Sequence, residues 1–212
     1  DLIARISDQS DAQSGQHSIR ELERIRDDNL VGIMRALRKT GSGAGSVLVK
    51  MDRHPNADDL LPVTVSRQVP QSWTDYNGHM NEAHYLEVFA QASDRFMELI
   101  GADAGYIAAG HSYFTAETHI RHLGEVHAGQ SVRVATQMIS GGGKKLHLFH
   151  RLQSAAGEVL ATGEHMLIHV NLETRRACNP SENVEKLIAE FADSHGALPL
   201  PDGAGRSIRA VS

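Results

Sequence analysis

The chain has 212 residues, 41% of them hydrophobic and 22% charged, which is the composition of a folded globular protein of one domain, or one domain with an appendage. A formal net charge of -5 without any basic block argues against a nucleic-acid surface. The single cysteine, Cys178, excludes an internal disulfide framework and fits a reducing, cytoplasmic compartment. No apolar run approaches the roughly 20 residues that span a bilayer, and the polar N-terminus does not resemble a secretory signal.

Residues 1–50 predict a short helical segment. Apolar side chains recur there at three- and four-residue steps, at Ile19, Leu22, Ile25, Leu30, Ile33, Met34 and Leu37. The glycine-rich run at 41–45 follows this helix rather than a strand, which favours a helix terminus over a phosphate-binding loop. Residues 51–61 are typical of a linker between domains. The chain begins at Asp1 rather than Met, so we expect it to be a piece of a longer protein.

From residue 62 the pattern changes to strands around one long helix. A strand begins at Val63 and is followed by a helix over about 81–100, which should be apolar nearly all round. Period-two alternation then predicts antiparallel strands at 112–122, 131–139, 145–153 and 158–170. Residues 176–212 predict an amphipathic helix at 182–194 and a loose tail from Leu198. This order predicts an α+β fold in which an antiparallel sheet wraps around a single helix.

The segment from Trp73 to Tyr85 carries the candidate chemistry. Asp75 lies about one turn ahead of the predicted helix start. A carboxylate there can attack a carbonyl or activate water, while free amides at the helix N-terminus stabilise an oxyanion. The alternative is that Asp75 only caps a turn, which is the common role of Asp before a helix.

This segment resembles the active-site segment of hotdog-fold acyl-CoA thioesterases of the 4-hydroxybenzoyl-CoA thioesterase type. The matching residues are Thr74-Asp75, Gly78-His79, Asn81 and Tyr85. The resemblance implies a hotdog domain over 62–175, hydrolysis of an acyl-CoA, Asp75 as the catalytic carboxylate and the amide of Glu82 as the group that polarises the carbonyl. It also implies that two copies pair, and an exposed strand edge in a single copy favours at least a homodimer.

The other residues of the motif have two readings each. Gly78 is expected at a positive φ or a close backbone approach. His79 either orients the substrate or serves the turn. Asn81 is a candidate N-cap as well as a site residue. Tyr85, one turn into the helix, either contacts substrate or packs in the core, where its hydroxyl would require a partner.

Residues 9–15 and 18–30 resemble the C-terminal end of the L-carnitine dehydrogenase family, some members of which are fused to a hotdog thioesterase domain. That family uses NAD, but its nucleotide-binding loop is not in this chain, so we expect no cofactor here. The resemblance implies betainyl-CoA as the substrate, in carnitine degradation. Its trimethylammonium group suits aromatic rings, and Trp73, Tyr76 and Tyr113 are the candidates.

Three further polar residues are weaker candidates. Glu117 is predicted on a strand, where it either lines the site or is simply exposed. Lys144 and Lys145 follow a glycine turn, where they either meet the phosphates of coenzyme A or form a solvated hairpin end.

The thirteen histidines show no metal-ligand spacing, so we expect no metal site. His119 and His122 are three apart on a predicted strand and therefore point to opposite faces, with Glu125 and His127 nearby. Two other functions remain open, a hotdog dehydratase or hydratase and a non-catalytic acyl-CoA-binding or oligomerisation module. A dehydratase usually pairs a His with an acidic residue, whereas the match here is to the turn at Thr74-Asp75. A binding module would not need a carboxylate at Asp75, so this residue discriminates between it and a thioesterase.

Overall fold

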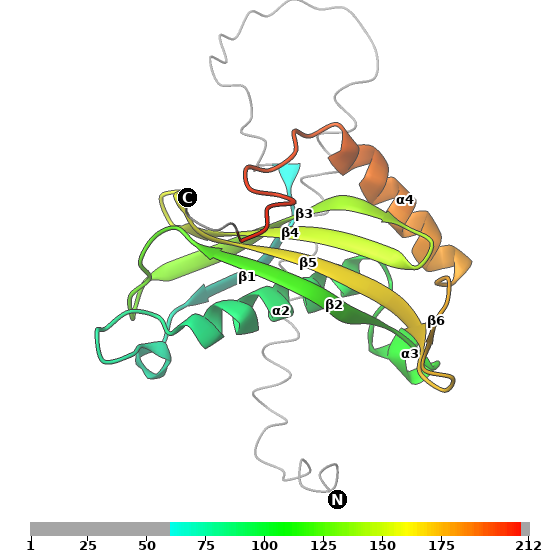
Figure 1. Cartoon of the computed structure of the whole chain (residues 1–212), viewed down its shortest axis with the longest axis horizontal. Helices are drawn as coiled ribbons and strands as arrows, with labels where there is room; N and C mark the ends of the chain where they lie inside the picture. Colours follow the sequence, from blue (N-terminus) through cyan, green and yellow to red (C-terminus); the bar gives the residue numbers. More distant parts are fainter. Residues whose placement is uncertain (1–59, 209–212) are drawn as a thin grey trace, which may run out of the picture. The chain divides into compact units, whose positions relative to one another are not determined.

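The computed structural model describes residues 60–208. The helical segment expected at 1–50 and most of the linker expected at 51–61 lie outside the described residues. Figure 1 shows the described elements, whose order and bounds are as follows. They are β1 (Val63–Gln68), η3 (Gln71–Trp73), α2 (Glu82–Leu99), α3 (Ala104–Ala108), β2 (His111–His122), β3 (Ser131–Gly142), β4 (Lys145–Ser154), β5 (Val159–Asn171), β6 (Arg176–Ala177) and α4 (Glu182–Gly196).

The strands form one antiparallel sheet in the order β1-β3-β4-β5-β2, with β6 paired to β5. Helix α2 lies along one face of this sheet and α4 covers part of the other face, against β3 (Figure 1). The predicted α+β fold with a sheet around one long helix is therefore confirmed. None of the helices within residues 60–208 combines the length and apolar character that crossing a bilayer requires.

Helix α2 buries one stripe of apolar side chains and is not apolar all round, because only one of its faces meets the sheet. The buried positions recur every three or four residues, at Tyr85, Val88, Phe89, Ala92, Ser93 and Phe96. The helix approaches β5 closely at Gly163, where a Cβ atom would lie 2.6 Å from the ring of Phe89. A glycine is therefore required at this position for the helix to pack as it does.

A chain of hydrogen bonds runs through the core between α2 and the sheet. Ser93 Oγ lies 2.9 Å from His150 Nε2, and His150 Nδ1 lies 2.8 Å from Thr136 Oγ1. Thr136 Oγ1 in turn lies 2.8 Å from Thr64 Oγ1. Full burial, with a smaller effect from His165, lowers the pKa of His150 well below its ordinary value, so the ring is neutral. Four elements, α2, β4, β3 and β1, are thus joined by satisfied polar groups.

Helix α4 and the segment after it are held to the outer face of the sheet. His195 Nδ1 accepts a hydrogen bond of 2.9 Å from the Met138 amide. Beyond the helix, Gln137 Nε2 donates to the Pro199 carbonyl, and the Gly205 amide donates to both oxygens of the Glu164 carboxylate. The expectation of a loose tail from Leu198 is therefore wrong as far as residue 205. Bonds to distant strands hold the segment, and local sequence patterns do not reveal such bonds.

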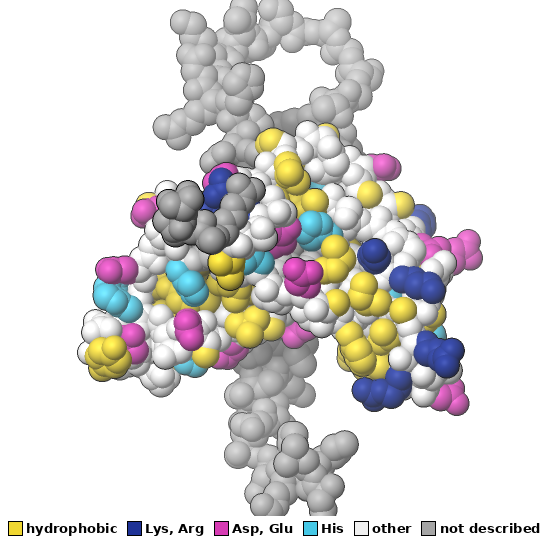
Figure 2. Space-filling view, in the orientation of Figure 1, with side chains coloured by type: hydrophobic (Ala, Val, Ile, Leu, Met, Phe, Trp, Pro, Cys, Tyr) yellow, Lys and Arg dark blue, Asp and Glu magenta, His cyan; other side chains and the backbone are white. Residues whose placement is uncertain are grey.

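Strand β2 forms one edge of the sheet, and its middle is uncovered. Residues 114–118 are all exposed, and Phe114 retains 42% of its accessible surface. Apolar side chains reach the surface along the course of this strand (Figure 2). A long edge strand with exposed apolar side chains is a surface that pairs readily with another chain.

Candidate active site

The turn that precedes α2 is closed by backbone hydrogen bonds. The Asn81 amide donates to the Trp73 carbonyl at 2.9 Å, and the Asp75 amide donates to the His79 carbonyl at 2.9 Å. Inside this frame the Gly78 amide donates to the Asp75 carbonyl at 3.0 Å. Gly78 has φ of 79°, the left-handed conformation expected from the sequence. The segment 73–81 therefore presents its side chains from a defined backbone.

The carboxylate of Asp75 is oriented by its own turn. Its Oδ1 atom accepts hydrogen bonds from the Asn77 amide at 2.8 Å and from the His79 amide at 3.2 Å. The side chain is only half-buried, so the carboxylate remains open to solvent and to a substrate. The turn-capping role considered from the sequence is real, and it fixes the carboxylate in place.

The N-terminus of α2 offers a free amide beside this turn. Asn81 is the N-cap, and its Oδ1 accepts from the Ala83 amide at 3.0 Å while its carbonyl accepts from the His84 amide at 3.0 Å. Within residues 60–208 no atom accepts a hydrogen bond from the Glu82 amide. An unpaired N–H at the positive end of an 18-residue helix is suited to stabilise a developing oxyanion.

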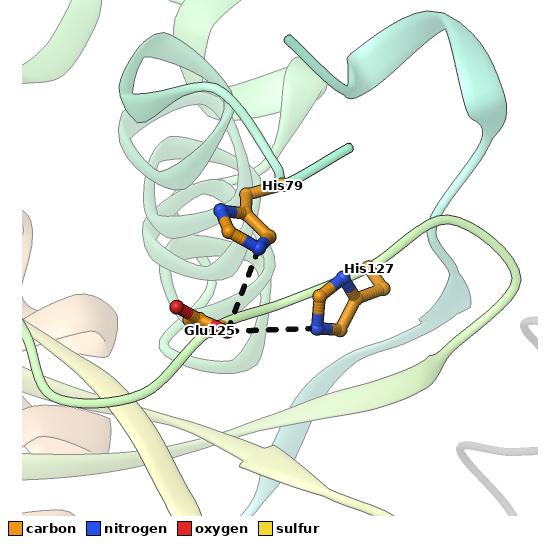
Figure 3. Close-up of side chains that lie close together, drawn as sticks. All are labelled: His79, Glu125 and His127. Carbon is orange, nitrogen blue, oxygen red and sulfur yellow. Dashed lines mark ion pairs between the residues drawn. The ribbon is translucent and has the colours of Figure 1, made fainter. Parts of the chain in front are cut away.

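Three potential metal-ligating side chains meet beside the turn, contrary to the expectation from spacing. His79 Nε2 lies 3.4 Å from Glu125 Oε2, and His127 Nε2 lies 3.8 Å from the same oxygen (Figure 3). Glu125 and His127 belong to the loop between β2 and β3, which pairs with the turn through an isolated bridge between His79 and His127. The sequence did suggest Glu125 and His127, but nothing local connects them to His79.

The remaining candidates of the helix and turn have different surroundings. Tyr85 is buried, with its ring at 4.5 Å from that of His122 in an edge-on contact, so it belongs to the core. Burial and, secondarily, the charge of Glu125 raise the pKa of Tyr85, which keeps its phenol protonated. Tyr76, by contrast, is 97% exposed.

The indole ring of Trp73 is in contact with two other side chains. The guanidinium carbon of Arg67 lies 3.8 Å from the ring centroid, and the ring of His84 stacks on the indole at 4.5 Å. These contacts tie β1, the turn and α2 together. The geometry therefore favours a packing role for Trp73 over a contact with the trimethylammonium group of a substrate.

The other predicted residues are not brought to Asp75 within one chain. Tyr113 is buried in the core cluster around Phe96 at the C-terminal end of α2. Glu117 is exposed in the middle of the edge strand β2. The β3–β4 turn with Lys144 and Lys145 lies at the end of the molecule opposite the Asp75 turn (Figure 1). Figure 2 likewise shows most Lys and Arg side chains of that face gathered near β6.

The Thioesterase-like superfamily matches residues 69–188, which is more than half of the chain. The chain belongs to this superfamily. The match includes the Asp75 turn, helix α2 and all strands from β2 to β6. The function expected from the short segment at 73–85 thus agrees with the classification of the whole domain.

Individual relatives show which thioesterases this chain is similar to. The chain is 58% identical, over 99% of its length, to the L-carnitine dehydrogenase/betainyl-CoA thioesterase of Ruegeria pomeroyi, and covers 45% of that protein. It thus spans less than half the length of the bifunctional relatives that it matches. The betainyl-CoA thioesterase of Pseudomonas aeruginosa is 42% identical over 68% of the chain, which covers 92% of that protein.

Solved structures show the same thioesterase architecture. A hypothetical protein of Staphylococcus aureus in complex with CoA aligns with a TM-score of 0.67 and 25% identity, over 71% of this chain and 97% of that one. A putative thioesterase of Pseudomonas putida aligns with a TM-score of 0.63 and 33% identity, over 72% of this chain and 98% of that one.

Proposed function

We propose that this chain is an acyl-CoA thioesterase that hydrolyses betainyl-CoA to glycine betaine and CoA. One observation carries the chemistry: the turn that orients the Asp75 carboxylate leads directly into the helix start where the Glu82 amide is free. The acyl group is inferred from the relatives, since a betainyl-CoA thioesterase of Pseudomonas aeruginosa aligns over nearly its whole length.

The reaction adds water across the thioester. The carbonyl oxygen accepts a hydrogen bond from the Glu82 amide, which stabilises the negative charge that develops as the tetrahedral intermediate forms. The carboxylate of Asp75 either attacks the carbonyl carbon directly or removes a proton from the attacking water. The C–S bond then breaks, and CoA leaves as the thiolate and takes up a proton. When water is the attacking group, the acyl group leaves directly as the carboxylate. When Asp75 attacks, a mixed anhydride forms, and water hydrolyses it to release the acyl carboxylate and restore the Asp75 carboxylate. Gly78 and His79 shape the turn that holds Asp75 in this position.

The active unit is inferred to be at least a homodimer that pairs along the exposed edge of β2. The positions of Lys144 and Lys145 support this inference, because within one chain they lie at the opposite end from Asp75. These lysines would therefore meet the phosphates of a CoA bound at the Asp75 turn of another copy. Light scattering tests the assembly: a fully active monomer at assay concentration contradicts it.

The complete protein is inferred to combine this domain with a carnitine dehydrogenase, as its bifunctional relatives do. Any NAD-dependent step belongs to that other part, and the thioesterase proposed here uses no cofactor. Residues 1–50, which resemble the end of such a dehydrogenase, would form the junction between the two parts.

The decisive experiment measures thiol release from betainyl-CoA, acetyl-CoA and a long-chain acyl-CoA by the same preparation. Selective release from betainyl-CoA supports both the reaction and the acyl group. Release from the other two substrates alone retains a thioesterase and discards the betainyl assignment. If a folded oligomer releases thiol from none of them, the binding or oligomerisation module becomes the better account.

A further inference from the structure

We propose that His79, Glu125 and His127 form a binding site for a divalent transition-metal ion of the zinc type. Two imidazoles and one carboxylate are the ligand set that such ions prefer, whereas magnesium and calcium prefer oxygen ligands alone. The proposal goes beyond thioester hydrolysis, because neither the carboxylate of Asp75 nor the amide of Glu82 requires an ion for the roles described above.

The three ligand atoms are close to the spacing that coordination requires. All lie within 4.8 Å of one another. With bonds of about 2.1 Å, two ligands of a tetrahedral ion are separated by roughly 3.4 Å. The distance from Glu125 Oε2 to His79 Nε2 is 3.4 Å and to His127 Nε2 is 3.8 Å. The two imidazoles need only small rotations of their side chains to close the set, and all three side chains face one another (Figure 3).

The backbone holds the ligands on one side of two paired segments. Glu125 and His127 flank buried Val126, so in an extended segment both project to the face opposite the valine. The Met80 amide donates to the Val126 carbonyl at 2.7 Å, which places His79 against this face. Main-chain bonds therefore bring the three residues to one place, and rotation of their side chains closes the ligand set.

The second ring nitrogen of His127 also has a hydrogen-bonding partner. His127 Nδ1 lies 3.4 Å from the Gly78 carbonyl, which favours the tautomer with the proton on Nδ1 and leaves Nε2 free for an ion. The side chains of His79, Glu125 and His127 are 36%, 70% and 55% exposed, so an ion can enter from solvent, and water can complete its coordination. A bound ion would join the Asp75 turn to the β2–β3 loop.

The test is calorimetric titration of the untagged, chelator-treated chain with zinc chloride, together with a thermal melt with and without zinc. We expect one saturable site and a raised melting temperature. His127→Ala and Glu125→Gln should each weaken binding at least about tenfold and abolish the thermal shift. His119→Ala, which removes an imidazole from β2, should bind zinc as the unaltered chain does.

Zinc affinity that is unchanged in His127→Ala overturns the proposal, as does equal loss in His119→Ala or the absence of any saturable binding. Circular dichroism of each variant tests whether the fold is kept, which is expected because His119, Glu125 and His127 are not buried. The readout is binding, so the result is independent of whether betainyl-CoA is the substrate.

Discussion

Polar residues, histidine among them, lie near both ends of helix α2, but their side chains have different surroundings at the two ends. At the N-terminal end, Asp75 and His79 lie on a turn that is partly open to solvent, beside an unpaired helix amide. At the C-terminal end, Tyr106 and His169 face inward. The hydroxyl of Tyr106 lies 2.8 Å from His169 Nε2, and the other ring nitrogen lies 2.9 Å from the Cys178 carbonyl.

Residue type alone therefore does not identify a functional site. The imidazole of His169 has both nitrogens occupied by the protein itself, and its ring stacks at 5.7 Å on His111. Burial lowers the pKa of His169 despite the opposing hydrogen bond to Cys178, so the ring is held neutral. Groups that are satisfied within the fold stabilise it, whereas charged groups and donors left open are available for a ligand.

The largest effect is expected when one carboxylate near each end of α2 is neutralised, which tests whether only the N-terminal end takes part in catalysis. We expect Asp75→Asn to lower kcat/KM about 1000-fold, since a positioned acid–base or nucleophilic carboxylate is lost. Asp103→Asn is the matched control, because Asp103 Oδ1 accepts the Tyr106 amide at 3.0 Å as the N-cap of α3. Steady-state kinetics of both variants decide the matter: if Asp75→Asn keeps its turnover, the two ends no longer differ in function.

Stability at low pH should distinguish buried histidines from exposed ones, because burial lowers the pKa of the ring. Burial lowers the pKa of His165 and of His195 to about 4. The unfolded chain binds protons below about pH 6.5 that the folded chain does not bind until about pH 4, so the free energy of unfolding falls as pH drops through this window. Each ring should contribute on the order of 3 kcal/mol over the whole window, and buried His150 acts in the same direction.

Urea unfolding between about pH 7 and about pH 4.5 measures this dependence. His195→Asn keeps an acceptor near the Met138 amide and should flatten the pH profile, whereas exposed His127→Ala should leave it unchanged. A profile that His195→Asn leaves as steep as before would show that the buried ring does not cause the loss.

A smaller effect is expected when the C-terminal end of α2 loses one hydroxyl. Tyr106→Phe removes the bond to His169 Nε2 and the acceptor for the Ser181 amide at 3.0 Å. The free energy of unfolding should fall by about 1–3 kcal/mol, because partners that the fold had satisfied are left unpaired. Thiol release per folded molecule should not change, and a parallel drop in kcat would place this end in the catalytic machinery.

The smallest effect is expected at the N-cap. Asn81→Ala removes the side-chain acceptor of the Ala83 amide and should cost about 1 kcal/mol of stability. It should also lower kcat several-fold, because fraying of the first turn displaces the Glu82 amide. Ser181→Ala provides the control, since Ser181 caps α4 without a side-chain hydrogen bond and should lose neither property. Equal effects of the two substitutions would remove the special role of the α2 terminus.

Much of the fold could be predicted because its signals are local. Helix α2 was expected at 81–100 and spans Glu82–Leu99, and the strands alternate as their residues suggested. Strand β3, expected at 131–139, extends to Gly142 because Gly141 packs in the sheet where a Cβ atom would lie 2.8 Å from Ile188. A glycine run reads as a turn in the sequence, and only the contact with α4 shows otherwise.

For the candidate site too, the features formed by neighbouring residues could be predicted, whereas contacts between distant segments could not. The segment 73–85 was found from its sequence because the turn, the cap and the helix start are neighbours in the chain. The pairing of His79 with Glu125 and His127, and the contact of Arg67 with Trp73, depend on tertiary packing between distant segments. Such pairings have no periodic signature, so the sequence alone predicts no metal-ligating group and leaves Trp73 as a candidate for the cation of the substrate.

The hydrogen-bonded chain from Ser93 to Thr64 bears on how new specificities could be engineered in this scaffold. It anchors the middle of α2 to three strands without using any residue of the segment 73–81 or of the loop 123–130. Directed evolution could therefore randomise the exposed positions of those two segments while the helix keeps its place, provided that buried Trp73, Met80 and Val126 are retained. A library confined to the exposed positions should remain largely folded, so that selection acts on the accepted acyl group instead of on survival of the protein.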